Sequence, residues 1–268
     1  MLIGVLADEP QSWIAREIER TDLGGHVVRF NSAQDLDEAL LQGDVSAAVR
    51  LLSALPVTQP DGIVIAALSE RRYPSGALLV SEKNERGARI LDAASAASVW
   101  VSDPLVSAQL RQIAPALRLL SGPRPEIDQT AEAIRSGRCE AAYIAEWEWE
   151  LSEKRTEGLK VITLHPLEVT PRPGQGVLAW QTHRDNITLR ERLQVAHRSD
   201  AAALTNVERR LARAFDGRPV CAFCVRDAQG YYHAFAALAD DGILKRAKAS
   251  QSTHVGLAER LFASLSAN

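Results

Sequence analysis

The chain has 268 residues, of which 46% are hydrophobic and 24% charged, and its formal net charge at pH 7 is −3. This length and composition exclude a single small module and a disordered polymer, and they allow two or three domains that each bury a core. The nearly balanced charge argues against nucleic acid or an anionic membrane as a partner. Met1 leads directly into an apolar strand-like segment without a leader, and no apolar run is long enough to span a bilayer, so we expect a cytoplasmic protein.

The first third of the chain predicts alternating strands and helices. Strands are expected at residues 2–6 and 26–30, and helices at 10–20 and from Ser32, a predicted N-cap, to Gly43, a predicted C-cap. The apolar runs at 45–52 and 62–68 are continuous, which is typical of strands buried on both faces. Together these elements predict a first α/β domain over residues 1–70, completed by residues 172–184.

A second series of similar design starts near Gly76 and predicts an α/β domain over residues 74–170. Strands are expected at 98–101, 117–120 and 141–145. A helix is expected after Ser102 or Asp103, with Pro104 in its first turn. Another is expected over 126–136. The acidic, tryptophan-containing segment 146–150 is interpreted as a helix start with one packing face.

The last third predicts a smaller α+β domain over residues 186–268. Gly174-Gln175-Gly176 leads into a strand rather than a helix, which favours a hinge over a phosphate loop. Helices are expected at 187–196 and 201–215, strands at 220–226, 231–238 and 243–249, and a closing helix capped by Ser252.

Two stretches of the chain resemble the hydroxymethylbilane synthase (porphobilinogen deaminase) family of tetrapyrrole biosynthesis. The first runs from Leu36 to Ser81 and includes Gly43-Asp44, Leu55-Pro56 and Glu70-Arg71; the second runs from Pro173 to Gly217 and includes Gly174-Gln175-Gly176 and Val207-Glu208-Arg209-Arg210. The resemblance implies two α/β domains similar to the lobes of periplasmic binding proteins and a smaller α+β domain at the C-terminus. It also implies a cleft for a small molecule, basic groups for the carboxylates of porphobilinogen, and a cysteine that carries a dipyrromethane cofactor.

The sequence departs from the family where the family's catalytic residues lie. The lysine-aspartate pair that precedes valine-proline in the family reads Ser53-Ala54 here, and the arginine and serine of its first loop correspond to Leu6 and Asp8. The family's serine and arginine turn in the second domain keeps only Ser102, followed by Asp103. Losing such groups lowers catalysis on the order of 10²-fold or more each, so we expect no ordinary deaminase turnover.

The cofactor cysteine is also displaced. Without a gap its position corresponds to Pro219, and Cys221 is reached only by a shift of two residues. We therefore expect no cofactor, and a dipyrromethane only if synthase activity is retained. The cysteines, Cys139, Cys221 and Cys224, are odd in number, which argues against a disulfide framework, and the last two point to opposite faces of a strand, so no metal site is expected.

The candidate site residues follow from these comparisons. The catalytic candidates are Ser53, Asp8 and Asp103; the ligand-binding candidates are Arg71, Arg72, Ser102 and Arg124; Cys221 is the weak candidate for a cofactor anchor. The expected partner is a small molecule in the interdomain cleft, and we expect a monomer that binds neither nucleic acid nor membrane.

Four functions remain open at this point. The first is a family member that has lost the deaminase site and binds a different small ligand or supports tetrapyrrole synthesis. The second is an active porphobilinogen deaminase with Cys221 as a displaced anchor. The third is a different enzyme on the same scaffold, and the fourth is a ligand sensor of the periplasmic-binding-protein type.

Overall fold

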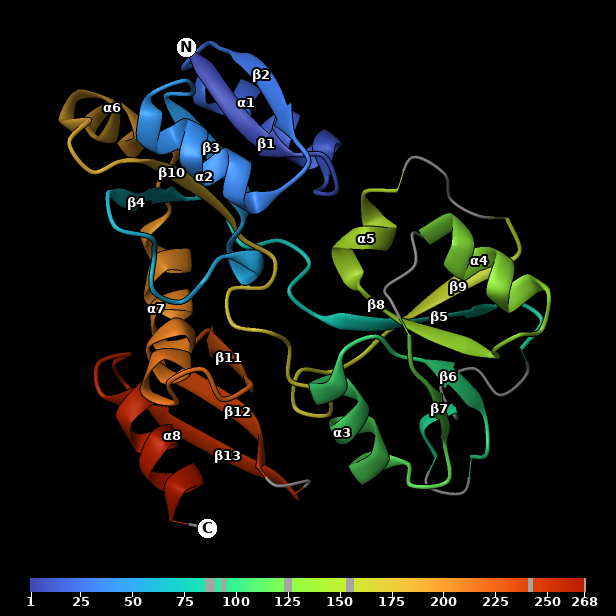
Figure 1. Cartoon of the computed structure of the whole chain (residues 1–268). Helices are drawn as coiled ribbons and strands as arrows, with labels where there is room; N and C mark the ends of the chain where they lie inside the picture. The colour runs from blue at the N-terminus through green and yellow to red at the C-terminus, as the bar shows by residue number, and fades with distance from the viewer. Residues whose placement is uncertain (85–89, 93–94, 123–126, 153–156, 241–242, 268) are drawn as a thin grey trace. The chain divides into compact units, whose positions relative to one another are not determined.

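A computed structural model of the chain describes residues 1–84, 90–92, 95–122, 127–152, 157–240 and 243–267. Figure 1 shows the helices and strands of the chain. The chain divides into two compact units. Unit 1 contains Met1–Arg72 and Gly174–Asn206, and unit 2 contains Tyr73–Pro173 and Val207–Asn268. Within the described residues, no helix is both long and apolar enough to cross a membrane.

Unit 1 is built on a five-stranded mixed sheet with the order β2-β1-β3-β10-β4. The strands are β1 (Leu2–Leu6), β2 (His26–Phe30), β3 (Ala47–Leu51), β4 (Ile63–Leu68) and β10 (Leu178–His183). β1 is parallel to β2 and β3, whereas β10 is antiparallel to both β3 and β4. The carboxyl ends of β1, β3 and β4 therefore lie at the same edge of the sheet.

Helices α1 and α2 pack on this sheet through their buried side chains. α2 (Ala33–Gln42) begins where the Ser32 hydroxyl accepts a hydrogen bond from the Asp35 amide, and it ends at Gly43 in the left-handed conformation. Leu36 and Leu40 of α2 pack against one face of the sheet. α1 (Gln11–Thr21) contributes Glu17, whose carboxylate accepts a hydrogen bond from the indole of the buried Trp180 on β10. α6 (Ile187–Arg192), a 3-10 turn (Leu193–Ala196) and the start of α7 (Ser199–Ala214) complete the unit.

Unit 2 contains a second sheet with an equivalent arrangement, β7-β6-β8-β5-β9. Its strands are β5 (Gly76–Ser81), β6 (Ser98–Trp100), β7 (Arg118–Leu120), β8 (Ala141–Ala145) and β9 (Leu159–Thr163), and its helices are α3 (Pro104–Ile113), α4 (Ile127–Arg135) and α5 (Glu146–Glu150). In both sheets three parallel strands are followed by an antiparallel strand and then a fifth strand. That antiparallel strand, β10 or β5, is the first strand after the chain enters the unit from the other one.

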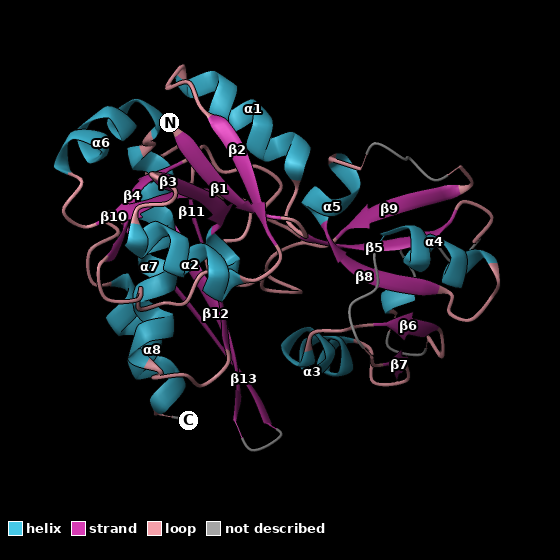
Figure 2. Ribbon diagram, turned by 45° about the horizontal axis from the view of Figure 1, so that its top comes forward, coloured by secondary structure: helices cyan, strands magenta, loops and turns pink. Residues whose placement is uncertain are grey.

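The C-terminal part of unit 2 is an antiparallel sheet of β11 (Val220–Arg226), β12 (Tyr232–Asp240) and β13 (Ile243–Gln251), followed by α8 (Leu257–Ser266) (Figure 2). One face of this sheet packs on α3 through Leu105, Cys221 and Ala237. The Arg246 guanidinium on β13 adds hydrogen bonds to the Gln112 side chain on α3 and to the carbonyl oxygen of Glu168.

The expected fold class, α/β with a smaller α+β part at the C-terminus, is confirmed. Two local predictions need correction, and one strand was missed. α8 is preceded by Gly256 in the left-handed conformation, so Ser252, four residues earlier, does not cap it. Residues 187–196 form an α-helix that tightens into a 3-10 turn rather than one helix, and β9 was not predicted. β9 forms because β5 leaves one edge open for it, a long-range pairing that the local pattern does not reveal.

Candidate functional site

Three predicted site residues lie at the carboxyl edge of the sheet in unit 1. Asp8 is exposed in the turn after β1, and Ser53 is half-buried in the 3-10 turn Leu52–Ala54 that follows β3. Arg71 follows β4, where its Nε donates a hydrogen bond to the carbonyl oxygen of Gln175. This edge of an open α/β sheet is where such folds bind ligands, because strand-end loops converge there.

The same edge contains a carboxyl group that the sequence reasoning missed. Glu9, next to the predicted Asp8, is only 7% exposed, and its Oε1 accepts a hydrogen bond from the Leu51 amide at 3.1 Å. Burial is the main cause that raises the pKa of Glu9 to about 7, against the lowering effects of the Leu51 amide and the Arg50 charge. The signal available in the sequence was its position in the turn after the buried strand β1, a position that Asp8 shares.

The basic side chains near this edge are engaged by protein groups. Arg50 on β3 is buried, and its Nη1 binds the Asp37 carboxylate at 3.0 Å. Arg72, one of the predicted ligand contacts, pairs with Glu70 at 3.0 Å, and both side chains are largely exposed. An anionic ligand at Arg72 would therefore compete with an existing ion pair.

In unit 2, the predicted Ser102 and Asp103 follow β6 and precede α3. Asp103, not Ser102, caps the helix: one carboxylate oxygen accepts from the Leu105 amide at 2.9 Å. The other oxygen binds the Arg172 guanidinium at 2.7 Å. Arg172 was not predicted as a site residue, and it neutralises the carboxylate that the sequence places at this turn.

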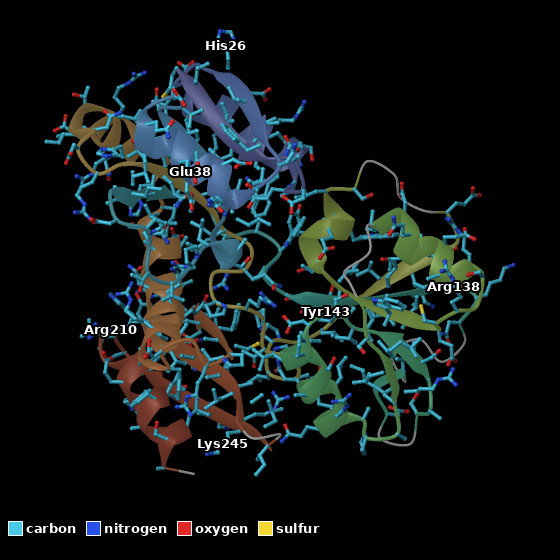
Figure 3. The ribbon with its side chains drawn as sticks, viewed as in Figure 1. His26, Glu38, Arg138, Tyr143, Arg210 and Lys245 are labelled. Carbon is cyan, nitrogen blue, oxygen red and sulfur yellow. The ribbon has the colours of Figure 1, made fainter. Side chains whose placement is uncertain are left out.

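Tyr143 lies on β8 (Figure 3). It is close enough to Asp103 and Arg172 to interact with both electrostatically. Burial raises the pKa of the Tyr143 phenol above its ordinary value, and the nearby Cys221 and Asp103 add to the effect. The phenol is therefore neutral at physiological pH and is suited to hydrogen bonding rather than to acting as a base.

Cys221 lies on β11 and is fully buried between the C-terminal sheet and α3. The Gln109 side chain donates a hydrogen bond to its Sγ at 3.5 Å, and the same amide group exchanges two hydrogen bonds with the Thr170 backbone. Burial raises the pKa of the Cys221 thiol to about 12, so the nucleophilic thiolate is scarce.

A thioether-linked dipyrromethane does not fit this position. The sulfur is enclosed by the Leu105 and Ala237 packing and has no exposed surface from which two pyrrole rings could extend. Cys139 and Cys224 are also buried, and neither is in a disulfide. Cys224 lies in the same strand, and its amide donates to the Glu208 carboxylate of α7.

The remaining predictions concern Arg124 and a metal site. Arg124 lies outside the described residues. In the part of the chain that the structure describes, no three histidine, cysteine or acidic side chains are grouped as a metal site would require.

Comparison with known proteins identifies the family. Residues 29–191, more than half of the chain, match the family model described as porphobilinogen deaminase, dipyromethane cofactor binding domain. The porphobilinogen deaminase of Rubrobacter xylanophilus is 31% identical over 212 residues, which cover 78% of this chain and 67% of that protein. The chain belongs to the porphobilinogen deaminase family.

Other curated relatives of this family member match over a smaller share of their length. The porphobilinogen deaminase of Thermobifida fusca is 32% identical over 187 residues, covering 69% of this chain and 55% of that protein. The one of Chromobacterium violaceum is 29% identical over 215 residues, covering 77% and 62%. The matched region thus spans roughly half to two thirds of these relatives.

Solved structures of binding proteins are also similar, at low identity. An ancestral cationic amino acid solute binding protein covers 72% of this chain with 86% of its own, at 11% identity and a TM-score of 0.47. A probable amino-acid ABC transporter extracellular-binding protein from Bacillus subtilis covers 73% of this chain with 89% of its own, at 12% identity and a TM-score of 0.46.

Proposed function

We propose that this porphobilinogen deaminase homologue acts in tetrapyrrole biosynthesis by binding a small molecule and that it does not polymerise porphobilinogen on a dipyrromethane cofactor. The observation that carries this proposal is the state of Cys221, which is enclosed, hydrogen-bonded and protonated. A cofactor-bearing cysteine needs a reactive thiolate and space for the attached rings.

The site residues support the same proposal. Ser53 and Ala54 supply no carboxylate where the family's catalytic aspartate is expected, and Asp103 already occupies the guanidinium of Arg172. A dicarboxylate substrate would therefore find few basic groups without a protein partner at the described strand ends. We further propose a cytoplasmic location and a monomeric state. The net charge of −3 supports a protein without a nucleic-acid partner.

Intact-mass spectrometry tests the proposal. The purified protein is expected to have its bare sequence mass both before and after incubation with porphobilinogen. The porphobilinogen deaminase of Rubrobacter xylanophilus is measured in parallel as the comparison protein. A mass increase of two pyrrole units that disappears in Cys221→Ser would establish the alternative, an active deaminase with a displaced anchor. A bare mass without binding of porphobilinogen would favour a different enzyme or a ligand sensor.

A further inference from the structure

Three side chains of the C-terminal sheet form a hydrogen-bonded row that the candidate site does not include. Asp227 lies in the turn between β11 and β12, His233 is on β12, and Ser250 is the residue opposite His233 on β13. The Asp227 Oδ2 lies 2.8 Å from His233 Nε2, and the Ser250 Oγ lies 2.8 Å from His233 Nδ1. A serine, a histidine and a carboxylate joined in this order are the groups that activate a serine for nucleophilic attack.

The hydrogen bonds determine which nitrogen of His233 carries the proton. The bond to His233 lowers the pKa of the Asp227 carboxyl group, and the Tyr231 amide, which donates to Oδ1 at 2.8 Å, adds to this effect. The ionised carboxylate is an acceptor only, so Nε2 of His233 donates to it. In the neutral imidazole Nδ1 is then unprotonated and accepts the hydrogen bond from the Ser250 hydroxyl. This is the tautomer that a general base for Ser250 requires.

The row lies on an exposed part of the sheet. Ser250 is exposed, and the side chains of His233 and Asp227 are each 32% exposed. Val225, opposite His233 on β11, is 37% exposed and offers an apolar surface beside the imidazole. The exposed Lys248 precedes Ser250 by two residues, so it lies on the same face about 7 Å along the strand. This surface suits a small apolar acyl group and places a cation near a developing negative charge.

We propose that Ser250 is a nucleophile activated by His233 and Asp227, and that it accepts acyl groups from small activated esters. This activity is separate from the proposed ligand binding in tetrapyrrole biosynthesis. All the residues that carry it belong to one unit, between β11 and β13.

The reaction has two balanced steps. In the first, Ser250 Oγ bonds to the carbonyl carbon of the ester while its proton passes to His233 Nδ1; the ester C–O bond then breaks, and the leaving oxygen takes that proton. In the second, a water oxygen attacks the acyl carbon and gives one proton to Nδ1. The bond to Oγ breaks, Ser250 recovers the proton, and a carboxylic acid leaves.

Acetylation of the full chain by p-nitrophenyl acetate tests the proposal, with the acetyl group located by peptide mass spectrometry. The wild type is expected to carry it on Ser250, and Ser250→Ala to carry none at this position. His233→Ala should acetylate Ser250 on the order of 10²-fold more slowly, because the general base is lost. Ser252→Ala, which removes an exposed hydroxyl two residues away, is the matched control and should react as the wild type does.

Asp227 is a positioning residue, and its test includes the protonation of the imidazole. The amide of Asp227→Asn can donate to His233 Nε2 and so move the ring proton to Nδ1, where it blocks acceptance from Ser250. Acetylation of Ser250 is expected to fall at least about tenfold in this variant. The ring ¹⁵N resonances of His233 should show the proton on Nε2 in the wild type and on Nδ1 in Asp227→Asn.

Two results would overturn the proposal. One is a folded wild type, judged by a cooperative unfolding transition, in which Ser250 is not acetylated faster than Ser252. The other is a rate at Ser250 that is the same in the wild type, His233→Ala and Asp227→Asn. Either result would leave the row as a support of the strand pairing alone. Because no tetrapyrrole precursor is used, neither result bears on the proposed function.

Discussion

At the scale of single residues, burial decides what Glu9 and Cys221 are able to do. Both groups lose contact with water on folding. Burial raises both pKa values because the charged form is poorly solvated inside the protein, so the neutral form is favoured. The result differs in kind. The pKa of the Cys221 thiol moves away from physiological pH, so the thiol stays neutral and only packs. The pKa of the Glu9 carboxyl group moves to about 7, so its charge changes with pH near neutrality.

The shift of Glu9 predicts a pH dependence of stability. Its pKa is raised on folding from 4.5 to about 7, so the folded state binds the proton more tightly than the unfolded state. The stabilisation is complete below the unfolded value and is lost as the pH rises through about 7, by up to about 3 kcal/mol. Glu9→Gln should therefore be more stable than the wild type at pH 8 and similar at pH 4.5, as measured by urea unfolding. Parallel pH profiles of the two proteins would contradict this.

At the scale of elements, the ends of α2 and α8 are formed in different ways. The Ser32 hydroxyl accepts from the Asp35 amide at 3.1 Å and satisfies one of the free donors of the first turn of α2. α8 instead starts after Gly256, whose positive φ lets the chain turn into the helix without a side-chain cap. Equivalent serines in the sequence therefore have different structural roles.

A matched pair of substitutions tests this difference. Ser32→Ala should lower the free energy of unfolding by about 1 kcal/mol because the cap is lost. Ser252→Ala should change it by less than about 0.5 kcal/mol, as is usual for surface positions without special contacts. Denaturant unfolding of both variants checks the pair, and an equal loss in both would show that Ser252 has an unrecognised role.

At the scale of the whole molecule, the two α/β sheets have the same strand order but are assembled from the chain differently. All five strands of the second sheet lie between residues 76 and 163. The first sheet needs β10, residues 178–183, which lies between β3 and β4 and pairs with both. Without β10, β3 and the edge strand β4 would each lose a paired neighbour, and the amides and carbonyls that bond to β10 would be unpaired.

Fragments make this asymmetry measurable. A fragment of residues 73–173 is expected to fold with mixed helix and strand content, although α3 loses its contact with the C-terminal sheet. A fragment of residues 1–72 should remain largely unfolded, because the place of β10 is empty. Circular dichroism with urea titration distinguishes the two, and a cooperative transition in the fragment 1–72 would refute the argument.

Most of the elements, the fold class and the family resemblance follow from local patterns in the sequence. Continuous apolar runs predicted β3 and β4, and Ser32 and Gly43 predicted the ends of α2, because buried strands and helix caps are set by local side-chain chemistry. The motifs around Gly174-Gln175-Gly176 carried the family resemblance, and the losses at Ser53 and Ala54 were visible without coordinates.

The partners of the polar side chains depend on contacts between distant parts of the chain. The pairing of Asp103 with Arg172 joins residues far apart in the sequence, and the enclosure of Cys221 depends on α3, so neither follows from a local pattern. Adjacent residues differ in burial for the same reason. Asp8 is exposed to solvent, whereas Glu9 is buried and accepts a hydrogen bond from the Leu51 amide. Burial and partner choice are properties of the packed chain, and they set the charge on each candidate site residue.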